Sequence, residues 1–129
     1  YKKNDYVTGF QEVGALPEDV PEELNELAGE MADVRSEQAL TAAAYFHAKF
    51  ENIHPFADGN GRTGRLLMNY LLLLLDHPPV IIHEEDRRAY YDALERFDSD
   101  QELDSLVEFL KAQTVKTWQA RFERGKNRT

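Results

Sequence analysis

Apolar residues recur every three or four positions through most of this chain, which is the spacing that places side chains on one face of a helix. One apolar stripe follows the proline-bounded stretch 17–21 and consists of Leu24, Leu27, Met31 and Val34. A second stripe consists of Leu40, Ala43, Ala44, His47 and Phe50. Ser36, a residue type that often caps helices, precedes the second stripe. The pattern predicts two helices before residue 54, the second with Ser36 as its N-cap.

The second half of the chain carries three more helical patterns. Between Gly61 and about Asp76 apolar residues occupy nearly every face, which predicts a helix in the centre of a bundle. Residues 84–97 have the spacing of a further helix, whose inward-facing residues are Tyr90, Leu94 and Phe97. Ser99 and Glu102 have the spacing of a capping box, which predicts the start of a last helix. We therefore predict a mainly α fold built as a helical bundle.

The two ends of the chain differ from this helical middle. Residues 1–16 lack helical spacing, and short extended pieces at residues 6–10 and 11–13 predict a small β-hairpin. At the other end, residues 120–129 are polar and rich in basic side chains, so we expect a frayed tail. The whole chain, residues 1–129, is predicted to form one domain.

Composition narrows the range of functions. The chain has 129 residues, a length typical of a single domain that buries its own core. A net charge of -9 argues against nonspecific nucleic-acid binding, which uses a basic surface. The absence of cysteine excludes disulfides and fits a reducing compartment, so we expect a cytoplasmic protein. The apolar run around Leu71–Leu75 is far shorter than the roughly 20 residues that cross a bilayer, and no membrane span is expected.

The residues with the most evident chemistry lie at 54–65, with the sequence His-Pro-Phe-Ala-Asp-Gly-Asn-Gly-Arg-Thr-Gly-Arg. A residue before proline is disfavoured in the helical region, so the preceding helix should end near Ile53 and His54 should project from a turn. An imidazole has an unperturbed pKa of roughly 6.5, which suits a general base that takes a proton from a hydroxyl. His54 is therefore the candidate catalytic residue.

The turn after His54 offers ligands for a metal ion and for phosphate. Asp58 supplies a hard oxygen, and Mg²⁺ is commonly held by one or two carboxylates together with substrate phosphates. Gly59 and Gly61 allow positive φ and close ligand approach, so backbone N–H groups around Asn60 can converge on a phosphate. A helix that starts there adds the positive end of its dipole. We predict a Mg²⁺ ligand at Asp58 and a phosphate-binding turn after it.

Two arginines, Arg62 and Arg65, lie one turn apart at the start of the same helix. Their guanidinium groups can hold phosphate oxygens in bidentate fashion. Without an anion, two cations at a helix N-terminus oppose the dipole at a cost on the order of a few tenths of a kcal/mol. A pattern that is unfavourable for folding indicates a role in anion binding.

Other interpretations of these residues are weaker. Residues 59–64 fit the pattern G-x-G-x-x-G, but a dinucleotide fingerprint follows a strand of a βαβ unit, whereas a helix is expected here. A plain glycine-rich turn between helices would explain the GNG alone but not the whole segment. Of the remaining histidines, we expect His47 to be a buried structural residue, and His77 and His83 to face solvent rather than bind a metal.

Residues 54–65 resemble the signature of the Fic family, H-x-F-x-[DE]-G-N-G-R-x-x-R, and match it at every specified position. The flanking segments that are also similar to this family are residues 45–53, 65–69, 78–82 and 88–94. The likeness covers roughly residues 36–110. It implies a Fic-type helical bundle with an N-terminal β-hairpin flap, here residues 1–16, that holds the target by strand addition. It also implies transfer of AMP from ATP to a hydroxyl side chain of another protein.

The resemblance further implies a role for each motif residue. ATP would be the co-substrate, Asp58 would hold Mg²⁺, and His54 would take the proton from a Ser, Thr or Tyr hydroxyl of the target. The residues that would bind the nucleotide are Gly59, Asn60, Gly61, Arg62, Thr63, Gly64 and Arg65. Relatives of the Doc type, which act as kinases, have lysine in place of the second glycine of the turn, so Gly61 favours AMP transfer.

Many Fic proteins are inhibited by a helix with the pattern [ST]-x-x-x-E-[GN], and this sequence has no match. Residues 8–12 have the spacing, but Val13 follows them and they lie at a different place. Inhibition would therefore come from a separate, antitoxin-like protein or from residues that precede Tyr1, or the protein would not be inhibited at all. Two alternatives use the same residues: removal of AMP from a modified protein, and an idle nucleotide-binding module that regulates a partner. The intact His54 argues against the idle module.

Overall fold

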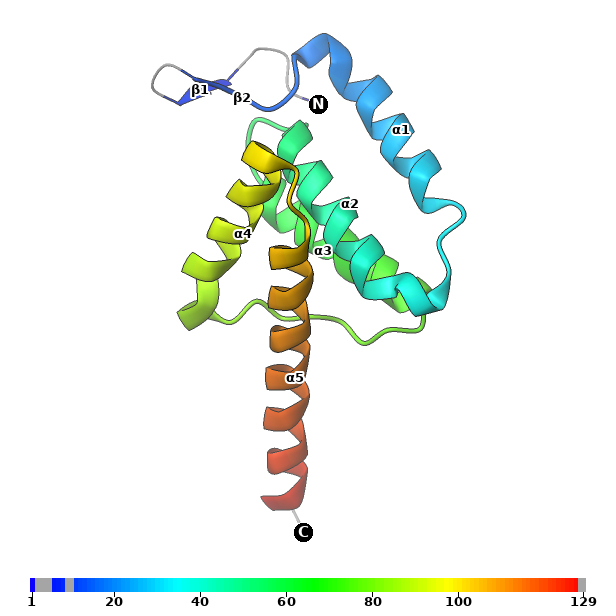
Figure 1. Ribbon diagram of the computed structural model, residues 1–129, viewed down its shortest axis with the longest axis vertical. Helices are drawn as coiled ribbons and strands as arrows, with labels where there is room; N and C mark the ends of the chain where they lie inside the picture. Colours follow the sequence, from blue (N-terminus) through cyan, green and yellow to red (C-terminus); the bar gives the residue numbers. More distant parts are fainter. Residues whose placement is uncertain (2–5, 9–10, 128–129) are drawn as a thin grey trace.

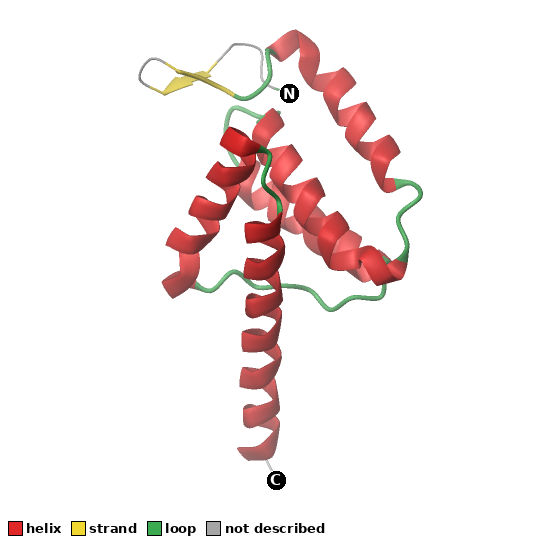
Figure 2. Cartoon of the chain, in the orientation of Figure 1, coloured by secondary structure: helices red, strands yellow, loops and turns green. Residues whose placement is uncertain are grey.

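The computed structural model describes the backbone of residues 1, 6–8 and 11–127 and the side chains of residues 1 and 14–119. Figures 1 and 2 show a bundle of helices with a small strand pair beside one end. The helices are α1 (Val20–Met31), α2 (Ala39–Ile53), α3 (Asn60–Leu74), α4 (Arg87–Asp100) and α5 (Asp104–Asn127). Single 3₁₀ turns precede three of them, and these are η1 (Pro17–Asp19), η2 (Ser36–Gln38) and η3 (Glu84–Asp86).

Two short strands precede the helices. β1 (Tyr6–Thr8) pairs antiparallel with β2 (Gln11–Val13), with Tyr6 opposite Val13 and Thr8 opposite Gln11. Residues 9 and 10, which belong to the extended piece expected at 6–10, lie outside the described residues. Because an isolated strand pair of this length adds little stability, the helices determine the fold.

The centre of the bundle is α2, which packs against α1, α3, α4 and α5 (Figure 1). The neighbouring helices can approach closely because Ala43, Ala44 and Ala48 of α2 have small side chains, each at most 1 % exposed. Larger buried side chains fill the space around these alanines, and they are Met68, Leu72, Tyr90, Phe97, Leu106 and Leu110. The prediction of a mainly α fold is confirmed.

The prediction that α3 occupies the centre is wrong. α3 packs chiefly against α2, toward which Met68 and Leu72 point, while Leu66 and Leu74 on its other faces are 70 % and 63 % exposed. Apolar residues on every face of a helix are typical of a buried helix, but burial also requires that other helices can pack around it. The small alanine side chains of α2 allow this close packing, whereas the larger side chains of α3 do not.

Two predicted helix starts are also wrong. Ser99 lies inside α4, which continues to Asp100 and ends at Gln101 with a φ of 58°. The first turn of α5 is held instead by Glu102, whose carboxylate accepts hydrogen bonds from the Ser105 backbone N–H at 2.8 Å and the Ser105 hydroxyl at 2.6 Å. Ser36 is likewise not an N-cap, since it is the first residue of η2 and Arg35 takes the cap position. Spacing alone did not distinguish a residue that caps one helix from a residue that ends another.

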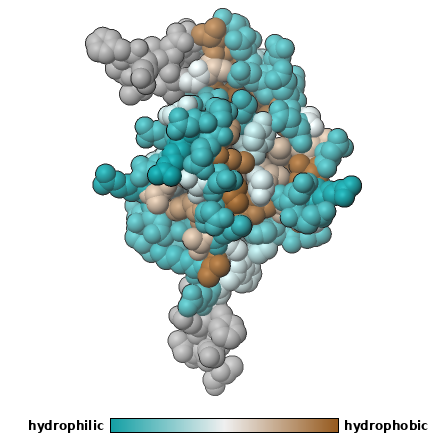
Figure 3. Space-filling model, viewed as in Figure 1, coloured by the Kyte–Doolittle hydropathy of each residue, from teal (hydrophilic) through white to brown (hydrophobic). Residues whose placement is uncertain are grey.

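At the C-terminus, α5 extends well beyond the other helices (Figure 1). We expected a frayed tail at 120–129; the backbone is helical to Asn127, and residues 128 and 129 lie outside the described residues. On the face shown in Figure 3, hydrophilic side chains cover most of the surface and apolar ones show in small patches between helices.

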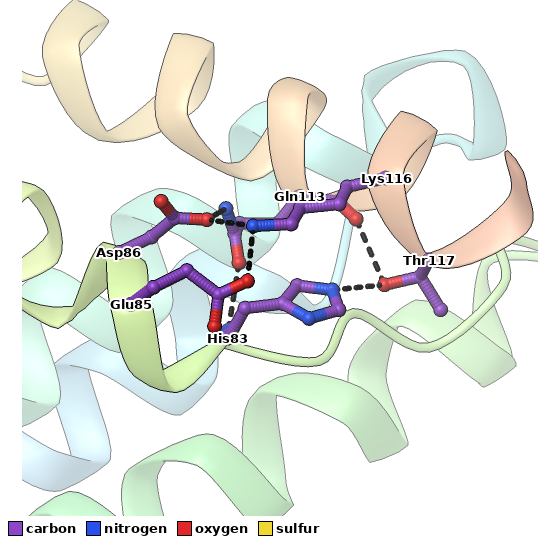
Figure 4. A network of polar contacts seen from close by, with 6 residues as sticks. All are labelled: His83, Glu85, Asp86, Gln113, Lys116 and Thr117. Carbon is purple, nitrogen blue, oxygen red and sulfur yellow. Dashed lines mark hydrogen bonds and ion pairs between the residues drawn. The ribbon is translucent and has the colours of Figure 1, made fainter. Parts of the chain in front are cut away.

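A polar network ties the connector before α4 to α5 (Figure 4). Its residues are His83, Glu85, Asp86, Gln113, Lys116 and Thr117. The His83 backbone N–H donates to Gln113 Oε1 at 2.8 Å, and its Nε2 lies 3.2 Å from the Thr117 hydroxyl. Lys116 Nζ lies 2.9 Å from Asp86 Oδ2. His83, which we expected to face solvent, is instead half-buried, because its ring contacts Thr117 of α5.

None of the helices in the described part of the chain combines the length and apolar character needed to cross a bilayer.

Candidate active site

His54 is the C-cap of α2 and adopts a left-handed conformation, with φ 53° and ψ 62°. Its backbone N–H still donates to the Phe50 carbonyl at 3.0 Å. The predicted helix end at Ile53 is confirmed. Proline was expected to push the preceding residue into an extended conformation. The left-handed region also avoids the helical one, and it is a common way for a helix to end.

The segment before α1 runs directly beside His54. The Ala15 backbone N–H donates to the Ile53 carbonyl at 3.0 Å, which joins this segment to the end of α2. Gly14 has a φ of +82°, and a Cβ atom placed on it would lie 2.4 Å from the Cβ of His54. Sequence reasoning missed this contact, although a glycine just after an extended piece is a signal for close approach of two backbones.

Asn60 holds the turn and contacts the histidine ring. Its side chain is 5 % exposed, its Oδ1 accepts from the Phe56 backbone N–H at 2.9 Å, and its Nδ2 donates to the Phe56 carbonyl at 2.7 Å. The same Nδ2 lies 3.2 Å from each ring nitrogen of His54. Asn60 therefore fixes the loop that connects the two helices and also orients the imidazole.

The glycine turn starts α3. Gly59, with a φ of +79°, is the N-cap, and its carbonyl accepts the first helical hydrogen bond from the Thr63 N–H at 2.9 Å. A Cβ on Gly59 would meet open space, so the left-handed backbone is what requires glycine here. The first N–H groups of a helix have no partner within the helix, and they can therefore bind an anion.

Asp58 stands exposed at the mouth of this turn, and its Oδ1 accepts from the Gly59 N–H at 2.9 Å. Within the residues that the structure describes, no group of three or more His, Cys, Asp or Glu side chains could hold a metal ion together. An exposed carboxylate next to a helix N-terminus fits Mg²⁺, which keeps waters and phosphate oxygens among its ligands.

The two arginines of the motif lie in different surroundings. The Arg62 side chain is exposed. Arg65 is half-buried and folds back along α3, so that its Nη1 lies 3.0 Å from the position that a Cβ on Gly61 would occupy. A side chain at 61 would therefore displace this guanidinium.

Beneath α3 lies a buried polar pair. His47 is fully buried, its Nε2 is hydrogen-bonded to the Tyr90 hydroxyl, and the two rings stack with centroids 5.6 Å apart. Burial lowers the pKa of His47 to about 4, so the ring is neutral near pH 7. Burial also raises the pKa of Tyr90 to about 12, and the Arg65 guanidinium beside the hydroxyl opposes this shift. The arrangement agrees with the structural role predicted for His47.

Gly64 faces α2 rather than the turn. A Cβ on it would lie 3.1 Å from His47 Nδ1 and 3.2 Å from Glu51 Oε1. Its role is therefore to let α3 approach these two side chains. Glu51, on the last turn of α2, was not identified from the sequence, because a single carboxylate on a helix gives no signal until its neighbours are known.

A cavity of about 280 Å³ opens beside Arg65. Its wall includes Asn69 of α3, the connector around Val80, and the exposed ring of Tyr91. Asn69 fixes the connector, since its amide donates to the Val80 carbonyl at 3.1 Å and accepts from the Val80 N–H at 2.8 Å. The cavity thus combines two arginines, Arg65 and Arg87, with an aromatic face.

The model of the Fic/DOC family matches residues 1–72. The chain is 48 % identical over 75 residues to the protein adenylyltransferase Fic of Drosophila persimilis, covering 58 % of this chain and 15 % of that protein. It is 58 % identical over 53 residues to the Aedes aegypti protein of the same name, covering 41 % of this chain and 11 % of that one.

A solved structure of Fic-1 (residues 134–508) from C. elegans superposes with a TM-score of 0.79 at 29 % identity, over 98 % of this chain and 38 % of that one. The 129 residues thus span a small part of the length of the curated relatives that they match.

Proposed function

Because this chain belongs to the Fic/DOC family, we propose that it transfers AMP from ATP to a Ser, Thr or Tyr hydroxyl of a target protein. The observation that carries the proposal is the joint position of His54 and the N-terminus of α3. Asn60 contacts the imidazole at 3.2 Å while being the first residue of the helix whose N-terminus would receive the phosphates. A proton acceptor and an anion site therefore lie on one short turn.

The phosphates of ATP would lie on the first turn of α3. The backbone N–H groups of Asn60 and Gly61 point along the helix axis and would donate to α- and β-phosphate oxygens. Arg62 and Arg65 would neutralise the outer phosphates. The Asn60 amide, already bonded to Phe56, would act mainly by holding the turn, and Thr63 and Gly64 would support the helix rather than touch phosphate.

Asp58 would hold Mg²⁺ together with phosphate oxygens, and the ion would supply charge neutralisation when bound. His54 would take the proton of the target hydroxyl. The hydroxyl oxygen then forms a bond to the α-phosphorus, the bond between the α-phosphorus and the bridging oxygen of the β-phosphate breaks, and pyrophosphate leaves. Most of the rate would come from positioning and from charge stabilisation by the helix and the arginines.

The strand pair would act as the flap that receives an extended target segment by strand addition. This role is supported by the segment after β2, which joins the end of α2 beside His54.

The sequence contains no inhibitory helix pattern, so we propose that a separate antitoxin-like protein could inhibit the enzyme. A cytoplasmic location is proposed from the absence of cysteine.

The test is an incubation of the protein, Mg²⁺ and a cell lysate with ATP labelled at the α- or at the γ-phosphate, alongside His54→Ala. AMP transfer requires protein labelling from the α position only and its loss in the variant. Labelling from the γ position would mean kinase chemistry. If neither position labels a protein, incubation with an AMP-modified protein tests the removal reaction, which uses the same residues.

A further inference from the structure

Glu51 lies on the last turn of α2, directly under the first turn of α3. Its Oε1 is buried and, among the described residues, has no hydrogen-bond partner. The same atom lies 3.6 Å from the position of a Cβ on Gly61 and 3.2 Å from that of a Cβ on Gly64. Burying a carboxylate oxygen without a hydrogen-bond partner lowers the stability of the fold. The presence of Glu51 at this place therefore indicates an electrostatic role.

The opposite charge lies across the same glycine. Arg65 Nη1 is 3.0 Å from the Gly61 Cβ position, and Glu51 Oε1 is 3.6 Å from it, so the guanidinium and the carboxylate lie near the same point. Burial raises the pKa of Glu51, and the Arg65 charge partly opposes this shift. The two half-buried groups therefore interact electrostatically.

We propose that Glu51 is a positioning residue that holds the Arg65 guanidinium in the orientation that binds the nucleotide phosphates. The inference rests on the proposed function, since it assigns the phosphates to the N-terminus of α3. Arginine has several rotatable bonds. An Arg65 side chain that is already held in its binding conformation loses less conformational entropy when the nucleotide binds. Glu51 acts through Arg65 and lies below the helix, away from the nucleotide.

The glycines of the motif explain how this pair can form. A side chain at 61 would meet the guanidinium, and one at 64 would meet the carboxylate and the His47 ring. Position 64 therefore needs a residue without Cβ for α3 to lie over Glu51, whereas a Cβ at 61 would displace only the end of the Arg65 side chain. The G-x-x-G spacing places the two glycines on the same face of the helix, which is the face toward α2.

The protonation state of Glu51 depends on several neighbours. Arg65 faces it from α3, Asp98 and Tyr90 face it from α4, and His47 precedes it on α2. Since burial raises the carboxyl pKa, a proton binds at a less acidic pH than to an exposed glutamate, and the protonated form no longer attracts Arg65. Nucleotide affinity should therefore fall as pH drops through that pKa.

The test compares the wild-type chain with Glu51→Gln, which keeps the shape and removes the charge, and with Glu37→Gln, an exposed glutamate of η2 at the far end of α2. Binding of Mg²⁺-ATP is measured by calorimetry between pH 5 and 8, and thermal unfolding of each variant is recorded. We expect Glu51→Gln to bind ATP about tenfold more weakly at pH 8, with the difference from wild type narrowing at low pH. Glu37→Gln should bind as wild type does.

A double-mutant cycle with Arg65→Ala separates positioning from a structural effect. If Glu51 acts through Arg65, Glu51→Gln should change ATP affinity little in the Arg65→Ala background. Additive losses, or wild-type affinity in Glu51→Gln at every pH, would overturn the inference. Because the readout is binding, it is independent of AMP transfer: a protein that binds ATP without transferring AMP would refute the proposed function and still test Glu51.

Discussion

Replacing Gly64 with alanine should destabilise the protein, although alanine is the better helix former. In a helix interior, alanine is favoured over glycine by about 1 kcal/mol. Against this, the new methyl would lie 3.1 Å from His47 Nδ1 and 3.2 Å from both His47 Cε1 and Glu51 Oε1. His47 is fully buried and bonded to Tyr90, so it cannot move aside without further loss. Overpacking of this kind costs about 1–3 kcal/mol.

The net expectation is a loss of about 1 kcal/mol, which lowers the melting temperature by about 3–5 °C for a chain of this length. Gly29 provides a matched control, because it lies inside α1 and nothing approaches within 4 Å of its Cβ position. Gly29→Ala should therefore stabilise the protein by up to about 1 kcal/mol. Urea unfolding and thermal melts of both variants give the comparison. If Gly64→Ala stabilises as much as Gly29→Ala, the close approach of α3 to His47 and Glu51 is not real.

Three further changes test the site. Asn60→Ala leaves the Phe56 backbone N–H and carbonyl without their partners, so the free energy of unfolding in urea should fall by about 1–3 kcal/mol. The rate of AMP transfer should fall about tenfold. Wild-type stability of this variant would show that the Asn60 amide does not hold the turn. Gly14→Ala places a Cβ 2.4 Å from the Cβ of His54, at a residue with a φ of +82°, so His54 should move. The NMR signals of the His54 ring should therefore shift, and unchanged signals would argue against the contact. His47 has a folded-state pKa of about 4, below its unfolded value of 6.5, so the unfolded state binds the proton first. The contribution of neutral His47 to the free energy of unfolding should be fully present above pH 6.5 and fall by about 3 kcal/mol between pH 6.5 and 4. Urea unfolding of His47→Gln should show little of this loss.

Much of the site could be predicted because local backbone rules determine it. Proline after His54 ends α2, and the glycines at 59 and 61 start α3, so the order of base, turn and helix N-terminus follows from neighbouring residues. The roles of Arg62 and Arg65 as phosphate ligands remain predictions.

The rest of the site depends on contacts between residues that are distant in the sequence. The role of Glu51 depends on the contact between α3 and α2 at Gly64. The role of Gly14 depends on the segment before α1, which lies against the end of α2. The exposure of α3 could not be predicted for the same reason, since it depends on the alanines of α2. Helix starts at Ser36 and Ser99 were misplaced because 3₁₀ turns and helix ends use the same polar residues as N-caps.

Measuring binding and transfer on the same variant tests whether His54 performs the chemistry while the turn at the start of α3 holds the nucleotide. Mg²⁺-ATP affinity is determined by calorimetry and AMP transfer by labelling from the α-phosphate, for the wild-type chain and for His54→Ala. We predict that His54→Ala binds ATP with nearly wild-type affinity and transfers no AMP. Transfer of AMP by this variant at the wild-type rate would contradict it.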